Sequence, residues 1–258
     1  MKNNNTQQKV TFKQLLENVK LFLKDIEALK TLLVPIHKTG YPFIIIFGLI
    51  SLIIGSFSDL FGWVGLILTI WCVYFFRDPI RITPKIKNVC FAPADGKVLP
   101  IKLTSPPPES GFNYKMNRVS VFMNVFNVHV NRIPVDGKIV KLSYVPGAYI
   151  NASLDKASEN NERMVINLEI EKNMNVVIVQ IAGLIARRIK CDLREGQIVK
   201  AGEKFGIIRF GSRVDLYLPE HFDISVLEGQ TMVGGETYFA HCKSKKQQNA
   251  NPKPLKKN

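Results

Sequence analysis

The spacing of hydrophobic and polar residues changes along the chain and divides it into segments of different texture. In the first, residues 1–38, apolar side chains recur every three or four positions between residues 11 and 34, and lysines fill the opposite face. This period predicts a basic amphipathic helix. Such a helix suits an anionic bilayer surface and also a groove on its own protein, and the pattern leaves the two open.

The second segment, residues 39–80, is the hydrophobic maximum of the chain. Two apolar runs of about 15 residues are separated by Asp59 and small residues, and each is short for a membrane-spanning helix, which needs about 17–25 residues. We therefore expect a helical hairpin that enters a membrane and returns. Lys38 precedes the runs and Arg77 and Arg81 follow them, which favours both ends on the cytoplasmic side. A single tilted span and a shallow re-entrant loop are the alternatives.

The third segment, residues 81–242, has a different texture. Short runs rich in valine, isoleucine, leucine and aromatic residues alternate with glycine turns. This pattern predicts a mainly β (β-rich α+β) domain of antiparallel hairpins with a barrel-like arrangement. The polar stretch 151–163 is expected to form a loop. Residues 243–258 are rich in lysine, asparagine and proline without acidic residues, which predicts a basic disordered tail.

Two pairs of short repeats occur within this domain. The sequence PADGKVLPI (93–101) resembles PVDGKIVKL (134–142), and EGQIVKAGE (195–203) resembles EGQTMVGGE (228–236). In each repeat an Asp-Gly or Glu-Gly step reads as a turn that leads into a strand. The repeats therefore predict an internal duplication of a β unit.

Composition narrows the range of partners. The chain has 258 residues, a formal net charge of +14 and an isoelectric point near 9.6. A basic balance suits an anionic partner, either a nucleic acid or an anionic membrane surface. No zinc-finger spacing and no aromatic RNA-binding pattern occurs in the sequence, so no nucleic-acid partner is predicted. For any single lysine, simple solvation is an equally good explanation.

The cysteines and histidines do not form a metal-binding pattern. Cys72, Cys90, Cys191 and Cys242 are widely spaced, and the sequence contains neither a CxxC pair nor a paired-histidine zinc motif. We expect no disulfide framework and no metal, and we expect reduced thiols in a cytosolic domain.

The pair Gly211–Ser212 interrupts an apolar strand pattern between residues 205 and 219. A glycine in a strand marks a bulge or a place of close approach, and a simple bulge is one interpretation. The other interpretation is chemical. A serine hydroxyl that loses its proton can attack the preceding carbonyl, and glycine accepts the strained backbone that this needs. The ester that forms would then eliminate, cut the chain and leave a pyruvoyl group in place of Ser212.

A base for this chemistry has to come from one of four histidines. His37 lies beside the apolar segment, His241 lies near the tail, and His221 follows a proline in a predicted turn. His129 lies between valines on a predicted strand, where a structural histidine is also common. An aspartate is needed to orient such a base, and Asp95 is a candidate, although Asp-Gly is also an ordinary turn.

Four motifs in order carry a family resemblance. The stretches FAPADGKV, FMNVFNVHVNRIPVDG, NASLDKASENNER and FGSRVDLYLP resemble the short-form phosphatidylserine decarboxylase family of pyruvoyl-dependent enzymes, over most of residues 70–238. By this resemblance, Gly211 and Ser212 match the self-cleavage pair, Asp95 the aspartate and His129 the histidine. The longer form of the family carries Leu-Gly-Ser-Thr at the cleavage site, whereas this chain has Phe-Gly-Ser-Arg.

The resemblance implies a two-stage mechanism. In maturation, Asp95 holds His129, which deprotonates Ser212. The chain then separates into a large chain, 1–211, and a small chain, 212–258, that begins with the pyruvoyl group and needs no external cofactor. In turnover, the pyruvoyl ketone forms a Schiff base with the amino group of phosphatidylserine, CO₂ departs, and phosphatidylethanolamine is released in phospholipid biosynthesis.

The sequence departs from the longer relatives at one position that bears on this mechanism. Those relatives carry two histidines three residues apart, which divide self-cleavage and decarboxylation between them, and here the second position is Arg132. His129 is therefore predicted to serve both steps. Four arginines are candidate contacts for the lipid phosphate or carboxylate: Arg187, Arg188, Arg209 and Arg213.

The expected partners follow from the substrate. A phosphatidylserine in an anionic membrane, a cell-membrane location at the cytoplasmic face and a heterodimer of the two cleaved chains are predicted, and a higher oligomer stays open. A biotinyl- or lipoyl-like hybrid-barrel module is the non-enzymatic alternative, although no Met-Lys-Met occurs. A pyruvoyl decarboxylase for a soluble amino acid or another serine lipid is the second alternative.

Overall fold

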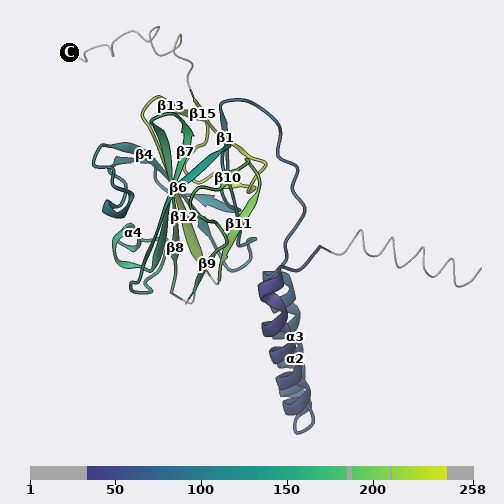
Figure 1. Cartoon of the computed structure of the whole chain (residues 1–258). Helices are drawn as coiled ribbons and strands as arrows, with labels where there is room; N and C mark the ends of the chain where they lie inside the picture. The colour runs from purple at the N-terminus through teal and green to yellow at the C-terminus, as the bar shows by residue number, and fades with distance from the viewer. Residues whose placement is uncertain (1–33, 185–187, 210, 243–258) are drawn as a thin grey trace, which may run out of the picture.

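The computed structural model describes residues 34–184, 188–209 and 211–242. The predicted amphipathic helix up to residue 33 and the predicted tail from residue 243 lie outside these residues. Within them, an apolar helical hairpin projects from one end of a β domain (Figure 1).

The hairpin consists of η1 (Lys38–Gly40), α2 (Tyr41–Gly55) and α3 (Asp59–Phe75). Small residues line the seam between the two long helices. The Ser51 hydroxyl donates a hydrogen bond of 3.1 Å to the Gly62 carbonyl, and a Cβ on Gly62 would lie 2.8 Å from the Gly55 Cα. Because the backbones approach so closely, large apolar side chains remain on the outside of the pair.

The outer surface of the hairpin is apolar and exposed, as at Leu52 (73% exposed) and Trp63 (65%). The stretch Lys38–Gly55 has a mean hydropathy of 1.7 and is, by length and composition, able to cross a membrane, whereas α3 is shorter. The predicted hairpin is thus present as two apolar helices joined by a short turn.

The β domain is antiparallel throughout its named pairings. Its longest sheet has nine strands in the order β10-β6-β7-β8-β12-β4-β2-β14, with β3 paired to β4. Two three-stranded sheets, β1-β15-β13 and β5-β11-β9, complete it. The sheets curl into a half-barrel (Figure 1), so the prediction of a mainly β fold is confirmed.

The strands are β1 (Val89–Phe91), β2 (Gly96–Val98), β3 (Lys102–Thr104), β4 (Met116–Met123), β5 (Val130–Arg132), β6 (Gly137–Val145), β7 (Arg163–Glu171), β8 (Met174–Ala182), β9 (Ile189–Cys191), β10 (Ile198–Val199), β11 (Lys204–Ile208), β12 (Ser212–Leu218), β13 (Phe222–Ile224), β14 (Thr231–Met232) and β15 (Tyr238–Cys242). Two short helices, η2 (Pro108–Ser110) and α4 (Ala157–Asn160), lie in the connections.

The predicted duplication is visible in the strand pairing. Each Asp-Gly repeat begins a strand, β2 or β6, and each Glu-Gly repeat supplies its edge partner, β14 or β10. The register is the same in both halves, because Gly96 lies opposite Met232 and Gly137 lies opposite Val199. The two repeat units therefore occupy the two ends of the nine-stranded sheet.

The two units also meet each other symmetrically. The backbone N–H of Phe91 donates to the carbonyl of Pro134 (2.7 Å), and the N–H of Arg132 donates to the carbonyl of Pro93 (2.8 Å). These four residues are equivalent in the two repeats, so the hydrogen bonds are reciprocal. They fix β5, and with it the segment that carries His129, to the start of the first repeat.

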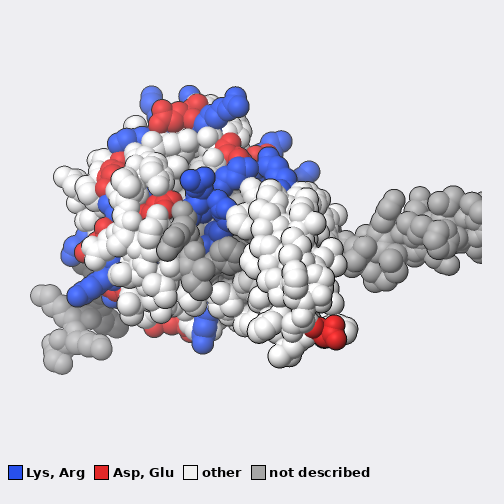
Figure 2. Space-filling model, turned by 90° about the horizontal axis from the view of Figure 1, so that it is seen from below, with Lys and Arg blue, Asp and Glu red and all other residues white. Residues whose placement is uncertain are grey.

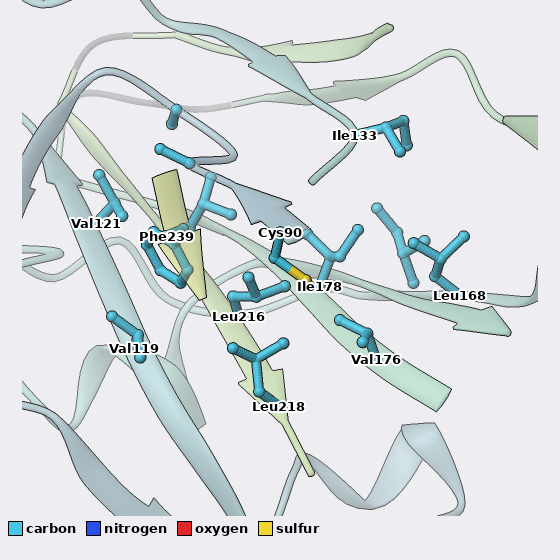
Figure 3. Close-up of a cluster of buried hydrophobic side chains, with 14 of the residues drawn as sticks. Cys90, Val119, Val121, Ile133, Leu168, Val176, Ile178, Leu216, Leu218 and Phe239 are labelled. Atoms are coloured by element: carbon cyan, nitrogen blue, oxygen red, sulfur yellow. The ribbon is translucent and has the colours of Figure 1, made fainter. Parts of the chain in front are cut away.

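The hydrophobic core lies between the curled sheets. Alternate side chains of the central strands point inward, and β12 is buried along its whole length. Figure 3 shows part of this cluster, which includes Cys90, Val119, Val121, Ile133, Leu168, Val176, Ile178, Leu216, Leu218 and Phe239. All four cysteines are free thiols.

Candidate active site

Gly211–Ser212 lies at a corner between two sheets. The sequence pattern reads as one interrupted strand, but the structure contains two strands, β11 and β12, which belong to different sheets. The chain leaves β11 after Ile208 and enters the centre of the nine-stranded sheet at Ser212. The glycine–serine pair therefore marks a change of sheet, and the interpretation as a bulge within one strand is wrong.

The corner holds the peptide bond between Gly211 and Ser212 in a defined geometry. Gly211 has φ +67°, in the left-handed region that glycine tolerates best. Ser212 is fully buried between Met123 of β4 and Ala182 of β8. Its Oγ lies 3.8 Å from the Met123 sulfur, a weak acceptor that leaves the hydroxyl available for stronger partners.

Gly183 makes room for the carbonyl of this peptide bond. A Cβ on Gly183 would lie 1.9 Å from the Gly211 carbonyl oxygen and 2.9 Å from its carbon. No real side chain tolerates such distances, so glycine is required here for close approach. In the sequence Gly183 is simply the glycine of an Ala-Gly pair that follows a predicted strand, and Gly183 was not among the predicted site residues.

A chain of hydrogen bonds connects Ser212 to buried polar side chains of the neighbouring strands. The Met123 sulfur that faces the Ser212 hydroxyl also accepts from the Asn131 amide at 3.7 Å. The Asn131 oxygen in turn accepts from the Gln180 amide at 2.8 Å. Ser212, Asn131 and Gln180 are all fully buried, and buried amides are held in place by such bonds. Ser212, at the start of β12, is therefore connected to a set of fixed buried polar groups and is not surrounded by hydrocarbon alone.

His129 lies immediately before β5 and faces the corner. Its Nδ1 is 3.0 Å from the Asn127 carbonyl oxygen, and its Nε2 is 3.2 Å from the backbone nitrogen of Gly211. A carbonyl can only accept and a backbone N–H can only donate, so the proton is on Nδ1 and the lone pair is on Nε2. The imidazole thus presents its basic nitrogen to the residue that precedes Ser212.

Burial keeps this imidazole neutral. His129 is fully buried, and burial lowers its pKa to about 4, with a further decrease from the charge of Arg77 and an opposing increase from the Asn127 carbonyl. Since the folded-state pKa is below neutrality, His129 is an uncharged base across the physiological range. The other histidines lie elsewhere, with His37 bonded to Thr39 and His221 beside Met174.

A resident metal is not suggested by the described residues. Within 34–184, 188–209 and 211–242, no group of three or more histidine, cysteine, aspartate or glutamate side chains could hold a metal ion. A cleft of about 570 Å³ lies between the linker at Thr83–Val89 and the strands that contain Ile170 and Phe222. None of the residues that line it takes part in the corner, so the size of this cleft is no guide to the chemistry.

Comparison with known proteins identifies the family. The family model described as phosphatidylserine decarboxylase matches residues 68–240. Proteins named phosphatidylserine decarboxylase proenzyme from Rickettsia typhi, Rickettsia prowazekii and Rickettsia felis are each 54% identical over 212 residues, which cover 82% of this chain and 92% of the relative.

The chain belongs to the phosphatidylserine decarboxylase family. It is therefore an enzyme of this type, and the resemblance drawn from its motifs is confirmed. The reading as a biotinyl- or lipoyl-like module does not apply to a phosphatidylserine decarboxylase.

The structure does not bring Asp95 to His129, contrary to the expectation from the resemblance. One Asp95 oxygen accepts from the Gly234 backbone N–H and the other pairs with Arg81, both at 2.8 Å. Burial raises the Asp95 pKa, while Gly234 and Arg81 oppose that increase. Both ring nitrogens of His129 have other partners, so the Asn127 carbonyl, not Asp95, orients the imidazole.

The duplication explains the position of Asp95. Its counterpart in the second repeat, Asp136, accepts from the Ala201 backbone N–H at 2.8 Å, which is the same bond that Asp95 accepts from Gly234. Each aspartate therefore holds the turn of the Glu-Gly repeat beside it. Asp95 differs from Asp136 by its ion pair with Arg81, which ties the linker after the hairpin to the domain.

Two of the arginines named from the sequence have structural roles. The Arg132 guanidinium donates to the Gly202 and Pro79 carbonyls. Arg213 is 1% exposed and forms an ion pair with Asp215 at 2.7 Å. Arg213 is therefore not available for a lipid phosphate, which corrects that expectation.

Arg213 instead fixes the loop that covers the start of β12. Its guanidinium donates to the Ala152 and Leu154 carbonyls and to the Ser158 hydroxyl. A buried guanidinium needs this full set of acceptors. The polar stretch 151–163, predicted as a loop, thus contains the short helix α4 and is anchored by the residue that follows Ser212.

Asp95 and Asp136 hold equivalent turns, but only Asp95 also forms the ion pair with Arg81, so the two aspartates allow the effect of that ion pair to be tested separately from the effect of the turn. Asp95→Asn keeps an oxygen that can hold the turn but removes the charge that pairs with Arg81. We expect this variant to slow the predicted self-cleavage about fivefold or more, equivalent to about 1 kcal/mol, because the linker that carries the hairpin is loosened. Asp136→Asn, for which the described residues show no ion pair, is the control. The measurement is the rate at which full-length chain disappears on denaturing gels, and equal rates in both variants would contradict the assignment.

Substitution of Gly183 tests the geometry of the corner. Gly183→Ala places a methyl group where the Gly211 carbonyl lies, so the carbonyl has to move. A displacement of about 1 Å can cost about 100-fold in rate, and we expect the predicted self-cleavage to slow by about that factor. Gly48→Ala is the control, since its Cβ would meet its nearest neighbour at an ordinary 3.9 Å. Circular dichroism should show that both variants are folded; a normal cleavage rate in Gly183→Ala would refute the requirement.

Proposed function

We propose that the chain cuts itself between Gly211 and Ser212 and then converts phosphatidylserine to phosphatidylethanolamine and CO₂ with the pyruvoyl group formed from Ser212. The observation that carries this proposal is the neutral His129 imidazole, whose basic Nε2 faces Gly211 at 3.2 Å. The word proenzyme in the names of the relatives supports a maturation by cleavage.

Maturation begins with a proton transfer. The Nε2 of His129 exchanges its bond with the Gly211 N–H for the Ser212 hydroxyl and accepts its proton. The oxygen attacks the Gly211 carbonyl carbon, the peptide C–N bond breaks, and the proton passes to the leaving amino group. The product is an ester between the Gly211 carbonyl and the Ser212 oxygen, with no net change in atoms.

Elimination then separates the two chains. The Cα proton of residue 212 is removed, the Cβ–Oγ bond breaks, and Gly211 leaves as a carboxylate. The dehydroalanine that remains at residue 212 rearranges to an imine, and water hydrolyses it to the keto group with release of ammonia. The large chain therefore ends at Gly211, and the small chain begins with the former Ser212.

The residues around Ser212 fit a pyruvoyl group at this position. Ser212 supplies the three carbon atoms of the pyruvoyl group. Gly211, in its left-handed conformation, has no side chain that would obstruct its departure after cleavage. When present, the pyruvoyl group supplies a carbonyl that captures the substrate amine and draws off the electron pair left by CO₂. His129 then delivers a proton to the carbon that has lost the carboxylate.

The two chains stay together because of where the cut lies. After cleavage, β12 remains hydrogen-bonded to β4 on one side and to β8 on the other. All seven of its residues are buried, so separation would expose the centre of the sheet. This supports a heterodimer of chains 1–211 and 212–258.

Arg209 and Arg188 are candidates for the lipid phosphate, whereas Arg187, named with them from the sequence, lies outside the described residues. Arg209 is half-buried two residues before Gly211, with its guanidinium 5.2 Å from the Phe43 ring at the base of the hairpin. Burial, and then the charge of Arg188, lowers the Arg209 pKa. Within the described residues neither arginine forms an ion pair, although the charge of Glu162 acts on Arg209 and opposes the decrease in its pKa. Two neighbouring guanidinium groups that are not paired in this way suit an anion.

The hairpin supports a membrane location. With a rise of 1.5 Å per residue, α2 and α3 reach about 22 and 26 Å, somewhat less than a hydrocarbon core of about 30 Å. Figure 2 shows the apolar hairpin beside lysine and arginine side chains on the adjoining face of the domain. An inserted hairpin would hold this basic face against anionic headgroups. We place the domain at the cytoplasmic face of the cell membrane, where Lys38 and Arg77 flank the insertion.

The mass of the purified chain tests the cofactor directly. Wild-type protein should give two chains that separate after residue 211, the smaller with a keto group in place of a free amine. Ser212→Ala should remain one chain of 29.2 kDa, because no hydroxyl can attack the carbonyl. Ser120→Ala, which alters another buried serine in the neighbouring strand β4, should cleave normally. A wild-type chain that stays intact and still decarboxylates would refute the proposal.

The same protein tests the substrate. Vesicles that contain carboxyl-labelled phosphatidylserine should release labelled CO₂ with wild-type protein and not with Ser212→Ala. Release from free serine, or from a different serine lipid but not from phosphatidylserine, would favour the alternative decarboxylases.

Arg209 can be tested through the kinetics. Loss of a charged hydrogen bond to the phosphate costs about 1.5–3 kcal/mol, so Arg209→Gln should raise KM for phosphatidylserine in mixed micelles about tenfold or more with little change in kcat. Lys172→Gln changes the net charge equally at the β7–β8 turn, the end of β8 far from Ala182 and Ser212, and should leave KM unchanged. An equal effect in both variants would indicate general electrostatic attraction instead of a phosphate site.

A further inference from the structure

The base of the hairpin lies directly on the catalytic histidine. The ring of Phe75, the last residue of α3, is 4.4 Å from the His129 ring between centroids, with an angle of 37° between the planes. Both side chains are fully buried. The apolar segment therefore reaches the site itself, and does more than connect it to a membrane.

This contact belongs to a separate hydrophobic cluster. Cys72, Phe75 and Phe76 from the end of α3 pack with Val128 and Val130, the two residues that flank His129. Ile207 of β11, the strand that leads to Gly211, completes the cluster. The histidine and the strand before the cleavage site are thus held by the same apolar contacts with the hairpin.

Hydrogen bonds fix the hairpin in this position. Arg77 donates to the Tyr74 carbonyl at the end of α3 and to the Phe126 carbonyl in the loop before His129, at 2.9 and 2.7 Å. The His37 N–H donates to the Phe76 carbonyl at 2.8 Å. The end of α3 is therefore tied to the loop whose Asn127 carbonyl orients the imidazole.

We propose that the hairpin forms a wall of the active site, and that Phe75 is a positioning residue that excludes water from His129 and holds its Nε2 toward Gly211. The consequences for self-cleavage rest on the proposed function, whereas the effect on the histidine itself does not. Phe75 packs on the imidazole, so its proposed role is to keep the base in place and shielded from water.

The ionisation of His129 provides the readout. Burial is the main cause of its lowered pKa, and Arg77, at the end of α3, is the charged group that adds to it. Without the Phe75 ring, water reaches the imidazole and the pKa rises from about 4 toward 6.5. The neutral base is then lost as the pH falls through this higher value, so self-cleavage should fail on the acid side at a higher pH than in wild type.

The test uses the full chain in micelles with Phe75→Ala, Phe75→Leu and, as control, Phe76→Leu. Phe76 is equally buried in the same cluster and stacks on Phe43 at 5.4 Å. First, NMR titration of His129 in a Ser212→Ala background reports its ionisation without any cleavage, with His129→Gln to assign the signal. Second, the rate of self-cleavage is measured from pH 5 to pH 8.

The proposal predicts that the pKa of His129 rises by at least about one unit in Phe75→Ala, rises less in Phe75→Leu, and is unchanged in Phe76→Leu. If the pKa reaches about 6, the neutral fraction at pH 5.5 falls about fourfold, and the ratio of cleavage rates at pH 5.5 and pH 8 should fall equally. An unshifted titration in folded Phe75→Ala or Phe75→Leu would overturn the proposal. Absence of cleavage in wild type, with the shift present, would refute the proposed function alone.

Discussion

The buried imidazole of His129 can act as a base only because each of its nitrogens faces a group with a single possible role. The Asn127 carbonyl can only accept and the Gly211 N–H can only donate, so the proton and the lone pair cannot exchange places without breaking a bond. Burial then keeps the ring neutral. The corner before β12, the loop before β5 and the end of α3 all have to be in place for this arrangement, and much of the fold serves to bring them together.

The internal duplication supplies the rigid frame for that arrangement. Two equivalent units pair their Asp-Gly and Glu-Gly strands in the same register and exchange reciprocal backbone hydrogen bonds near Pro93 and Pro134. The frame also changes the view of Asp95. Asp136 accepts the equivalent bond from its own neighbouring turn in the second repeat, so holding that turn is a structural role that Asp95 shares with it. The charge of Asp95 also pairs with Arg81, which lies in the linker after the hairpin.

The proposed cleavage site combines two glycine requirements of different kinds. Gly211 needs freedom of backbone angle, since its φ is +67°; space is not the constraint there, because only its chain neighbours come within 4 Å of where its Cβ would be. Gly183 needs absence of volume, since the Gly211 carbonyl occupies the space of its Cβ. The buried Arg213–Asp215 pair then holds the covering loop from the other side of Ser212. Together these features position the Gly211 carbonyl at the start of β12, next to the buried Ser212.

The sequence by itself determined the features that depend on local pattern. Apolar runs on either side of Asp59 predicted a helical hairpin, and repeats with Asp-Gly and Glu-Gly predicted a duplicated β domain. Four motifs in order, which include Gly211–Ser212 and His129, indicated the family and the candidate chemistry. Only the tertiary structure decided that Asn127 orients His129, that Arg213 is buried against Asp215, and that Phe75 packs on the His129 ring. The physical reason is that period and turn chemistry act between neighbours in sequence, whereas these contacts join residues whose proximity is set by strand order and by the packing of α3 on the domain.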